Sequence, residues 1–287
     1  MRRERGGRGL WLVAGAFVAV GAVATVVVAA MNGGGRSSEP TTGLPASMAA
    51  IGDSMTRAVN ARGPVGADLA QHSWATGTDR GDGVVSHHER ILAANGSAAP
   101  TTFNNAVSGA RMSDAREQAL AAVDQGVEYV TFLMGANDAC AYSVGAMTPV
   151  RRFQRQLERT MRILAEGLPE ARIYIVSIPD VTRLWDVLHG DPQAMLIWNT
   201  FGICRSALAQ SNDAGARAKV RQRVIDYNRA LAEACRRYPN CIWDGGAVFR
   251  YRFDAEDVSP IDFFHPSLTG QRHLADISWR HGPWADR

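Results

Sequence analysis

The chain has 287 residues, 46% of them hydrophobic and 21% charged, which allows one sizeable domain and excludes wholesale disorder. Five of its 31 basic and one of its 28 acidic residues lie within residues 1–36. The remaining 26 basic and 27 acidic residues carry a net charge of −1, so composition gives no reason to expect nucleic-acid binding.

The first 31 residues have the pattern of a membrane-inserted segment. Clustered arginines precede an uncharged run of 22 residues from Leu10 to Met31, which is long enough to cross a bilayer as a helix. A signal-peptide core is usually shorter, although Val28-Ala29-Ala30 offers a cleavage site. We therefore expect a transmembrane anchor over residues 1–31, with a cleaved signal peptide or a buried core helix as alternatives. The arginines before the run predict that the rest of the chain is extracytoplasmic, either membrane-anchored or secreted.

Residues 32–46 are rich in glycine, serine, threonine and proline, which predicts a flexible linker. From residue 47 to residue 287, short apolar segments alternate with amphipathic helical patterns, as expected of one domain with a parallel sheet covered by helices on both faces. The expected strands are Met48–Ile51, Thr102–Val107, Tyr129–Met134, Arg172–Ile178 and Cys241–Trp243.

Two long helices are expected between these strands. For the first, Thr148 is the expected N-cap, Pro149 the first helical residue and Gly167 the end. The second runs from about Arg217 to Arg237. Residues 181–212 form an extra apolar segment before it, which is either a cap that binds an acyl chain or touches lipid, or a set of helices packed on the body.

Four short motifs fall at the ends of predicted strands or before the last helix. Gly52-Asp53-Ser54 follows the first strand, where we expect a helix to begin and the serine hydroxyl to be exposed. Gly109 follows the second strand and Asn137 the third, while Asp262 and His265 lie three residues apart near the C-terminus. Taken singly, each motif also fits a structural explanation, such as a helix cap, a strand-end glycine or an Asx turn.

Together the four motifs supply everything that acyl transfer needs. Ser54 is the candidate nucleophile, His265 the base, and Asp262 the carboxylate that orients the base. The N–H groups of Ser54 and Gly109 and the side chain of Asn137 are the candidate oxyanion donors. Parallel α/β sheets place their chemistry at the carboxyl ends of the strands, where these motifs fall. The chain has no G-x-S-x-G motif, which argues against the α/β-hydrolase family.

In this order the motifs resemble those of the SGNH/GDSL hydrolase family, over about residues 47–281. Met55 stands where the family name has leucine after the serine. The resemblance implies an α/β fold, a three-layer α/β/α sandwich with a flavodoxin-like five-stranded parallel sheet, and a Ser/His/Asp triad without metal or cofactor. The sequences MGANDAC and DFFHPSLTG resemble the phospholipase B-like and extracellular lipase branches.

We therefore expect a serine esterase or lipase that hydrolyses carboxylic esters, such as lipid or acyl esters, through an acyl-enzyme. One alternative is an esterase that removes O-acetyl groups from cell-wall carbohydrate. The other is a catalytically silent envelope protein that binds glycan or lipid. The expected partners are a small-molecule or lipid ester and, through the N-terminal helix, the membrane.

Four cysteines suit an oxidising compartment and allow three disulfide pairings. Cys235–Cys241 is favoured because it closes a short loop between a predicted helix and a strand, which leaves Cys140–Cys204. Four unpaired thiols are the alternative. No CxxC pair is present, so a structural zinc site is not expected.

The remaining histidines are given no catalytic role. His87-His88-Glu89 is interpreted as a solvated loop because adjacent side chains diverge and no HExxH motif follows. His72, His189 and His273 show no spacing to a partner.

Overall fold

A computed structural model describes residues 43–96 and 99–286. Its centre is a five-stranded sheet with the order β2-β1-β3-β4-β5, in which every pair of neighbours is parallel. This is the strand order of flavodoxin-like folds. The strands are β1 (Ser47–Gly52), β2 (Thr101–Asn104), β3 (Tyr129–Leu133), β4 (Arg172–Ile175) and β5 (Cys241–Trp243).

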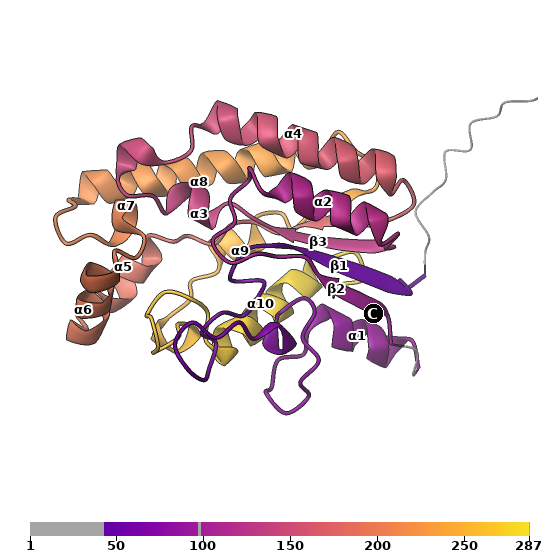
Figure 1. Cartoon of the computed structure of the whole chain (residues 1–287), viewed down its shortest axis with the longest axis horizontal. Helices are drawn as coiled ribbons and strands as arrows, with labels where there is room; N and C mark the ends of the chain where they lie inside the picture. The colour runs from indigo at the N-terminus through magenta and orange to yellow at the C-terminus, as the bar shows by residue number, and fades with distance from the viewer. Residues whose placement is uncertain (1–42, 97–98, 287) are drawn as a thin grey trace, which may run out of the picture. The chain divides into compact units, whose positions relative to one another are not determined.

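The helices cover both faces of the sheet, so the predicted three-layer sandwich is confirmed (Figure 1). One face is covered by α2 (Ala115–Asp124), α4 (Val150–Gly167) and α8 (Ala214–Cys235), which pack side by side. The other face carries α1 (His87–Ala94) and α10 (Leu268–Arg280).

The shorter helices lie in the connections. Three of them occupy residues 181–212 and lie together at one end of the fold, as Figure 1 shows: α5 (Arg183–Leu188), α6 (Pro192–Phe201) and α7 (Arg205–Leu208). The others are η1 (Ala70–His72), α3 (Ala136–Ala139), η2 (Val144–Ala146), α9 (Ala247–Arg250) and η3 (Ala255–Asp257).

Strand β3 is buried on both faces, and its side chains alternate between two hydrophobic clusters. Val130 and Phe132 belong to the cluster that contains residues of α2, α4 and α8, whereas Tyr129 and Leu133 belong to the cluster that contains residues of α1 and α10. The two-sided burial explains why the β3 segment is largely apolar along its whole length.

Two predicted strands end three residues early, at Asn104 and Ile175. For β4 the reason is visible in the hydrogen bonds. The Ser177 N–H donates to the Asp244 carboxylate (3.0 Å) and the Ile178 N–H to the Asn228 side chain (2.9 Å). These side chains replace a neighbouring strand as the backbone's partners.

The predicted start of α4 is wrong by one residue. Pro149 is the N-cap and Val150 the first helical residue, and the Pro149 carbonyl accepts the Phe153 N–H (3.1 Å). Thr148 is held by other contacts, because its N–H donates to the Asp138 carbonyl (3.0 Å) and its own carbonyl accepts from Arg223 (2.8 Å).

Both predicted disulfides, Cys140–Cys204 and Cys235–Cys241, are confirmed. The predicted anchor over residues 1–31 lies outside the described residues, as does the linker up to residue 42. Within the described part of the chain, no helix combines the length and apolar character needed to span a membrane.

Candidate active site

Ser54 follows β1 on a turn that only a glycine can open. A Cβ on Gly52 would lie 2.3 Å from Thr56 Oγ1 and 3.0 Å from the Leu133 carbonyl oxygen. The Gln118 side chain accepts the Gly52 N–H (2.8 Å) and donates to its carbonyl (3.0 Å), which fixes this end of the strand. The prediction that a helix begins at Ser54 is wrong: the segment forms successive turns, because Ala58 and Asn60 have positive φ angles of 50° and 56°.

Asp262 and His265 lie on a tight turn that faces Ser54. Ser54 Oγ lies 2.7 Å from His265 Nε2, and His265 Nδ1 lies 2.5 Å from Asp262 Oδ2. The turn is closed by the N–H groups of Phe264 (2.9 Å) and His265 (3.0 Å), which both donate to Asp262 Oδ1. Three residues that are far apart in sequence therefore form one continuous chain of hydrogen bonds.

The surroundings of Asp262 favour its charged form. Burial raises the pKa of this carboxyl, but the hydrogen bond and charge of His265, the Asn60 amide and the His265 N–H together lower the pKa below its usual value. An ionised carboxylate at this place can fix the imidazole tautomer and stabilise an imidazolium. The Asn60 amide lies 2.5 Å from Asp262 Oδ2, a contact that no sequence motif predicts.

Asp53 has the opposite environment. Its side chain is buried next to Ser54, and burial raises its pKa to about 6 against the opposing effects of the Met55 N–H and of His265. Only Oδ1 has a partner, the Met55 N–H at 3.0 Å, whereas Oδ2 is buried without one. From its place in the sequence Asp53 is expected only as part of the turn, and its perturbed pKa is not predicted.

Of the two further oxyanion candidates, only Asn137 borders the same cavity as Ser54. Asn137 lies on α3, directly after β3, and one amide hydrogen of Nδ2 donates to the Ala110 carbonyl (3.0 Å). The amide has a second hydrogen for a ligand. Gly109 has a positive φ of 78° and is exposed. It does not line this cavity, although it precedes Ala110, the residue that Asn137 contacts.

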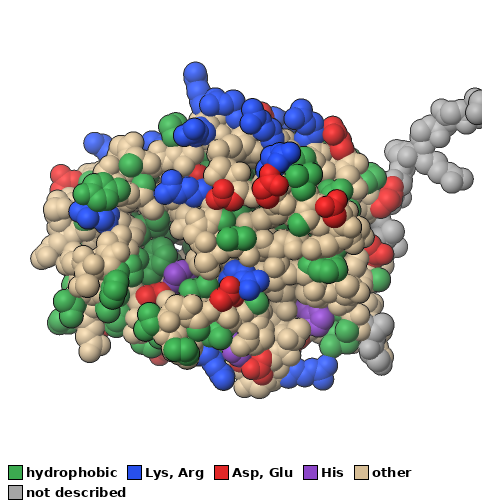
Figure 2. All heavy atoms as spheres, in the orientation of Figure 1, with side chains coloured by type: hydrophobic (Ala, Val, Ile, Leu, Met, Phe, Trp, Pro, Cys, Tyr) green, Lys and Arg blue, Asp and Glu red, His purple; other side chains and the backbone are tan. Residues whose placement is uncertain are grey.

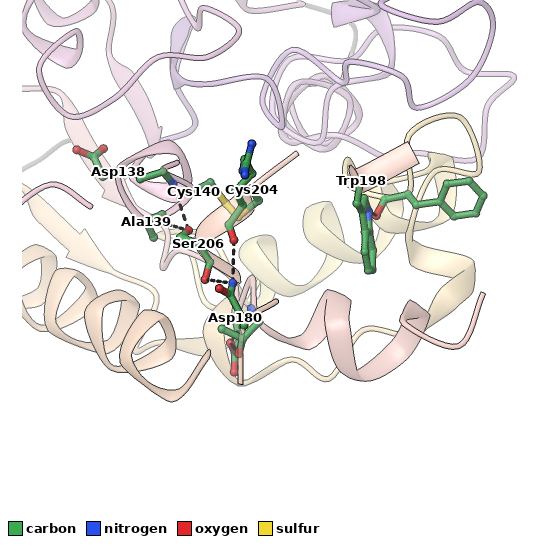
Figure 3. The surroundings of a disulfide bond; sticks show 12 residues. Asp138, Ala139, Cys140, Asp180, Trp198, Cys204 and Ser206 are labelled. Atoms are coloured by element: carbon green, nitrogen blue, oxygen red, sulfur yellow. Dashed lines mark hydrogen bonds between the residues drawn. A yellow bond between two sulfur atoms is a disulfide. The ribbon is translucent and has the colours of Figure 1, made fainter. Parts of the chain in front are cut away.

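The short helix that carries Asn137 is fastened to residues 181–212 (Figure 3). The Cys140–Cys204 disulfide joins the end of α3 to the start of α7. Next to it, the Ser206 hydroxyl donates to the Ala139 carbonyl (2.7 Å), and the Ser206 N–H donates to the Ala141 carbonyl (2.9 Å). The extra segment therefore supports the side of the site on which Asn137 lies.

The cavity beside Ser54 and His265 has an apolar wall. Its polar lining residues are Asp53, Ser54, Asn137, Asp257 and His265, and Tyr251 adds a hydroxyl. The other lining residues are apolar or glycine: Met55, Ala136, Pro179, Val181, Leu184, Val248, Phe253, Val258, Phe264, Pro266, Gly270, Leu274 and Ile277. Figure 2 shows a hollow, left of centre in the view, that hydrophobic side chains and a histidine border.

Residues 181–212 take part in this wall but do not form it alone. Val181 and Leu184 line the cavity, and the buried Trp198 donates from Nε1 to the Phe263 carbonyl (3.0 Å) in the turn between Asp262 and His265. Leu196 and Phe201 on α6 are exposed. The segment therefore packs on the body, as the second alternative predicts, and also contributes to the cavity, while its binding of an acyl chain or lipid stays a prediction.

The interpretation of His87-His88-Glu89 as a solvated loop is wrong. These residues open α1, and His87 is fully buried between the Tyr129 hydroxyl (2.9 Å) and the Ser278 hydroxyl (2.8 Å). Burial, and to a lesser extent the charge of Arg90, lowers the pKa of His87 to about 3, so it is a neutral core residue.

Two other histidines have partners that their spacing does not reveal. His273 contacts Asp257 (2.6 Å) and the Tyr251 hydroxyl (2.8 Å), and His72 contacts Asp82 (2.6 Å). His72 and Asp82 also lie near Asp79, and within residues 43–96 and 99–286 these three are the one group with metal-ligand donors close enough to share an ion. Since none of the three lines the Ser54 cavity, they are separate from the proposed chemistry.

A parallel α/β sheet with serine, histidine and carboxylate in hydrogen-bond contact is the arrangement expected of a hydrolase with the SGNH fold. Residues 50–273 match the model of the GDSL-like Lipase/Acylhydrolase family. The chain belongs to this family, so the resemblance drawn from the sequence is confirmed.

The similar solved structures are distant in sequence. Phospholipase A1 from Streptomyces albidoflavus is 14% identical with a TM-score of 0.52, over 82% of this chain and 99% of that one. The extracellular lipase of Streptomyces rimosus is 17% identical (TM-score 0.47, 80% and 97% covered). A Clostridium thermocellum family 3 carbohydrate esterase is 12% identical (TM-score 0.47, 82% and 93% covered). No curated protein matches the chain significantly.

Proposed function

We propose that the protein hydrolyses carboxylic esters through an acyl-enzyme on Ser54. The observation that carries this proposal is the chain of contacts from Ser54 Oγ to His265 Nε2 (2.7 Å) and from His265 Nδ1 to Asp262 (2.5 Å) at the wall of an open cavity. These are the distances over which a base takes a proton from a nucleophile.

In the first step Ser54 Oγ attacks the acyl carbonyl carbon and its proton moves to His265 Nε2. Asp262 stabilises the imidazolium, and its lowered pKa keeps it ionised for this purpose. The negative oxygen of the tetrahedral intermediate accepts from the Ser54 N–H and from the Asn137 amide, which both border the cavity. When the intermediate collapses, the alcohol leaves with the proton from His265. A water molecule, deprotonated by His265, then releases the acid and regenerates Ser54.

The substrate that the cavity favours is an ester with an apolar acyl group. Apart from the reacting residues, the wall presents mainly aliphatic and aromatic side chains, such as Leu184, Val248 and Ile277. Burial of each CH₂ group of an acyl chain against such a wall contributes about 0.8 kcal/mol. A cell-wall O-acetyl ester has a single methyl group to bury and gains little from this wall.

The acyl preference is measured with p-nitrophenyl esters from acetyl to long-chain acyl groups, and with phospholipids of different head groups. We expect kcat/KM to rise with acyl length. A preference for acetyl esters would favour the carbohydrate O-acetyl esterase.

The ester hydrolase itself is tested with Ser54→Ala, which we expect to abolish turnover of every p-nitrophenyl ester. Ser211→Ala is a matched control, because Ser211 is exposed and does not line the cavity. Retention of activity by folded Ser54→Ala would overturn the proposal. Absence of ester turnover by the unmodified protein, together with binding of glycan or lipid, would support the silent envelope protein.

We further propose that this domain, residues 47–287, works outside the cytoplasm, anchored by residues 1–31 or released after their cleavage. The two disulfides support an oxidising compartment. Protease added to intact cells should reach the domain, and the N-terminal sequence of the mature protein distinguishes anchor from signal peptide. Complete protection from protease, until the cells are lysed, would contradict an exposed domain.

A further inference from the structure

Asn60 makes an unusual set of contacts six residues after the nucleophile. Its backbone is left-handed, with φ at 56°, and its side chain is buried. Nδ2 donates to Asp262 Oδ2 (2.5 Å), and Oδ1 accepts the Gly66 N–H (2.6 Å). The Gly66 contact fixes which end of the amide faces Asp262, because the backbone N–H needs an acceptor and a carboxylate needs a donor.

The backbone of Asn60 makes a second link to the turn that carries the base. Its carbonyl accepts from the Ser259 hydroxyl (2.5 Å), and the Ser259 N–H in turn donates to the His265 carbonyl (2.8 Å). The residue before Asn60, Val59, is hydrogen-bonded to the nucleophile's backbone, because its N–H donates to the Ser54 carbonyl (3.0 Å). Asn60 therefore connects two parts of the chain that are 202 residues apart and between which the proton must move.

Asp262 is held by four donors, and Asn60 supplies the one that comes from another part of the chain. Phe264 and His265 donate their N–H groups to Oδ1, whereas the His265 ring and the Asn60 amide share Oδ2. The donors from its own turn move with Asp262. Among the described contacts of this carboxylate, the Asn60 amide is what holds it in register with the Ser54 segment.

We propose that Asn60 is a positioning residue for the ester hydrolysis, which holds Asp262, and through it His265, in line with Ser54. The inference rests on the proposed function, since it needs Ser54 and His265 to react. Asn60 does not line the cavity beside Ser54, so its effect should be on kcat and not on KM.

Three variants separate this role from a structural one. Asn60→Gly keeps the left-handed backbone without strain and removes the amide. Loss of a hydrogen bond to a charged group should lower kcat roughly 10- to 100-fold, with KM little changed. Asn60→Asp retains an acceptor for Gly66 but places a carboxylate against Asp262, so it should be slower than Asn60→Gly at pH 8. Asn240→Ala is the control, a buried asparagine that donates to the Leu168 (3.2 Å) and Ala171 (3.0 Å) carbonyls, outside the cavity, and should keep its kcat.

The decisive measurement is the same substitution in an Asp262→Ala background. If Asn60 acts through Asp262, Asn60→Gly should lower kcat by less than twofold there. The proposal is overturned if Asn60→Gly stays within twofold of the unmodified enzyme, if Asn60→Asp is faster than Asn60→Gly, or if the loss persists without Asp262. Urea unfolding of each variant shows whether it is folded, and full activity of Ser54→Ala would instead refute the hydrolase on which the inference rests.

Discussion

The two disulfides should differ in their contribution to stability. Cys140 and Cys204 are 64 residues apart in sequence, whereas Cys235 and Cys241 are only 6 apart. A crosslink restricts the unfolded chain more when it closes a longer loop. For loops of these lengths, the chain-entropy relation gives about 4 kcal/mol for the first disulfide and about 2 kcal/mol for the second.

The test compares the double variants Cys140→Ala/Cys204→Ala and Cys235→Ala/Cys241→Ala with the unmodified protein in urea at equilibrium. Alanine is chosen because Cys204 and Cys235 are buried, and a serine at either position would bury a hydroxyl group away from water. The Cys140→Ala/Cys204→Ala variant should lower the free energy of unfolding by about 2 kcal/mol more than the Cys235→Ala/Cys241→Ala variant. Equal losses, or a larger loss for the second pair, would refute the loop-length argument.

The same variants should differ in activity. Because Cys140–Cys204 fastens the helix of Asn137, its removal should lower kcat, by less than Asn137→Ala does since the Ser206 contacts remain (Figure 3). Removal of Cys235–Cys241 should leave kcat unchanged, because neither residue lines the cavity. An unchanged kcat in the first pair would show that the helix needs no such support.

Three further changes have expected outcomes. Asn137→Ala should lower kcat by about 10²–10³ with acyl esters, as expected for loss of an oxyanion donor, and a loss below threefold would exclude that role. Because burial lowers the pKa of His87 to about 3, the unfolded chain takes up a proton between about pH 6.5 and pH 3 that the folded protein does not. The free energy of unfolding should therefore fall on acidification through this range, by at most about 1.4 kcal/mol per pH unit. In urea unfolding, His87→Gln should show a smaller fall per pH unit, and an equal fall would contradict a buried, neutral His87. Because burial raises the pKa of Asp53 to about 6, its contribution is fully present below about pH 4 and is lost as the pH rises through 6. Asp53→Asn should accordingly gain stability relative to the unmodified protein between pH 4 and pH 8, and a constant difference would argue against a buried, protonated Asp53.

The sheet can be predicted from the sequence because its central strands, β1, β3 and β4, are almost entirely buried and therefore appear as largely apolar runs between amphipathic helices. The residues at which the strands end are harder to predict. Residues 176–178 continue the apolar pattern of β4, but Asp244 and Asn228, which bind the backbone there, come from distant segments. The predicted start of α4 at Thr148 and Pro149 is wrong for a similar reason, because Thr148 makes hydrogen bonds with Asp138 and Arg223 instead of capping the helix.

In the candidate site, too, residues in local motifs can be predicted from the sequence, whereas contacts between distant segments cannot. Ser54, Asn137, Asp262 and His265 could be named because each lies in a short motif after a strand or before a helix. Asn60 has no such motif, and its role depends on a contact across 202 residues.

The partners of the histidines could not be predicted either. The partners of His87 and His273 come from other elements, which spacing along the chain does not show.

The central claim, that Ser54 is an activated nucleophile, is tested most directly by a fluorophosphonate probe and peptide mapping of the labelled protein. The proposed mechanism predicts that the probe attaches to Ser54, that Ser54→Ala takes up none, and that His265→Ala reacts far more slowly because no base receives the proton. Labelling at another residue, or equal labelling rates with and without His265, would contradict it.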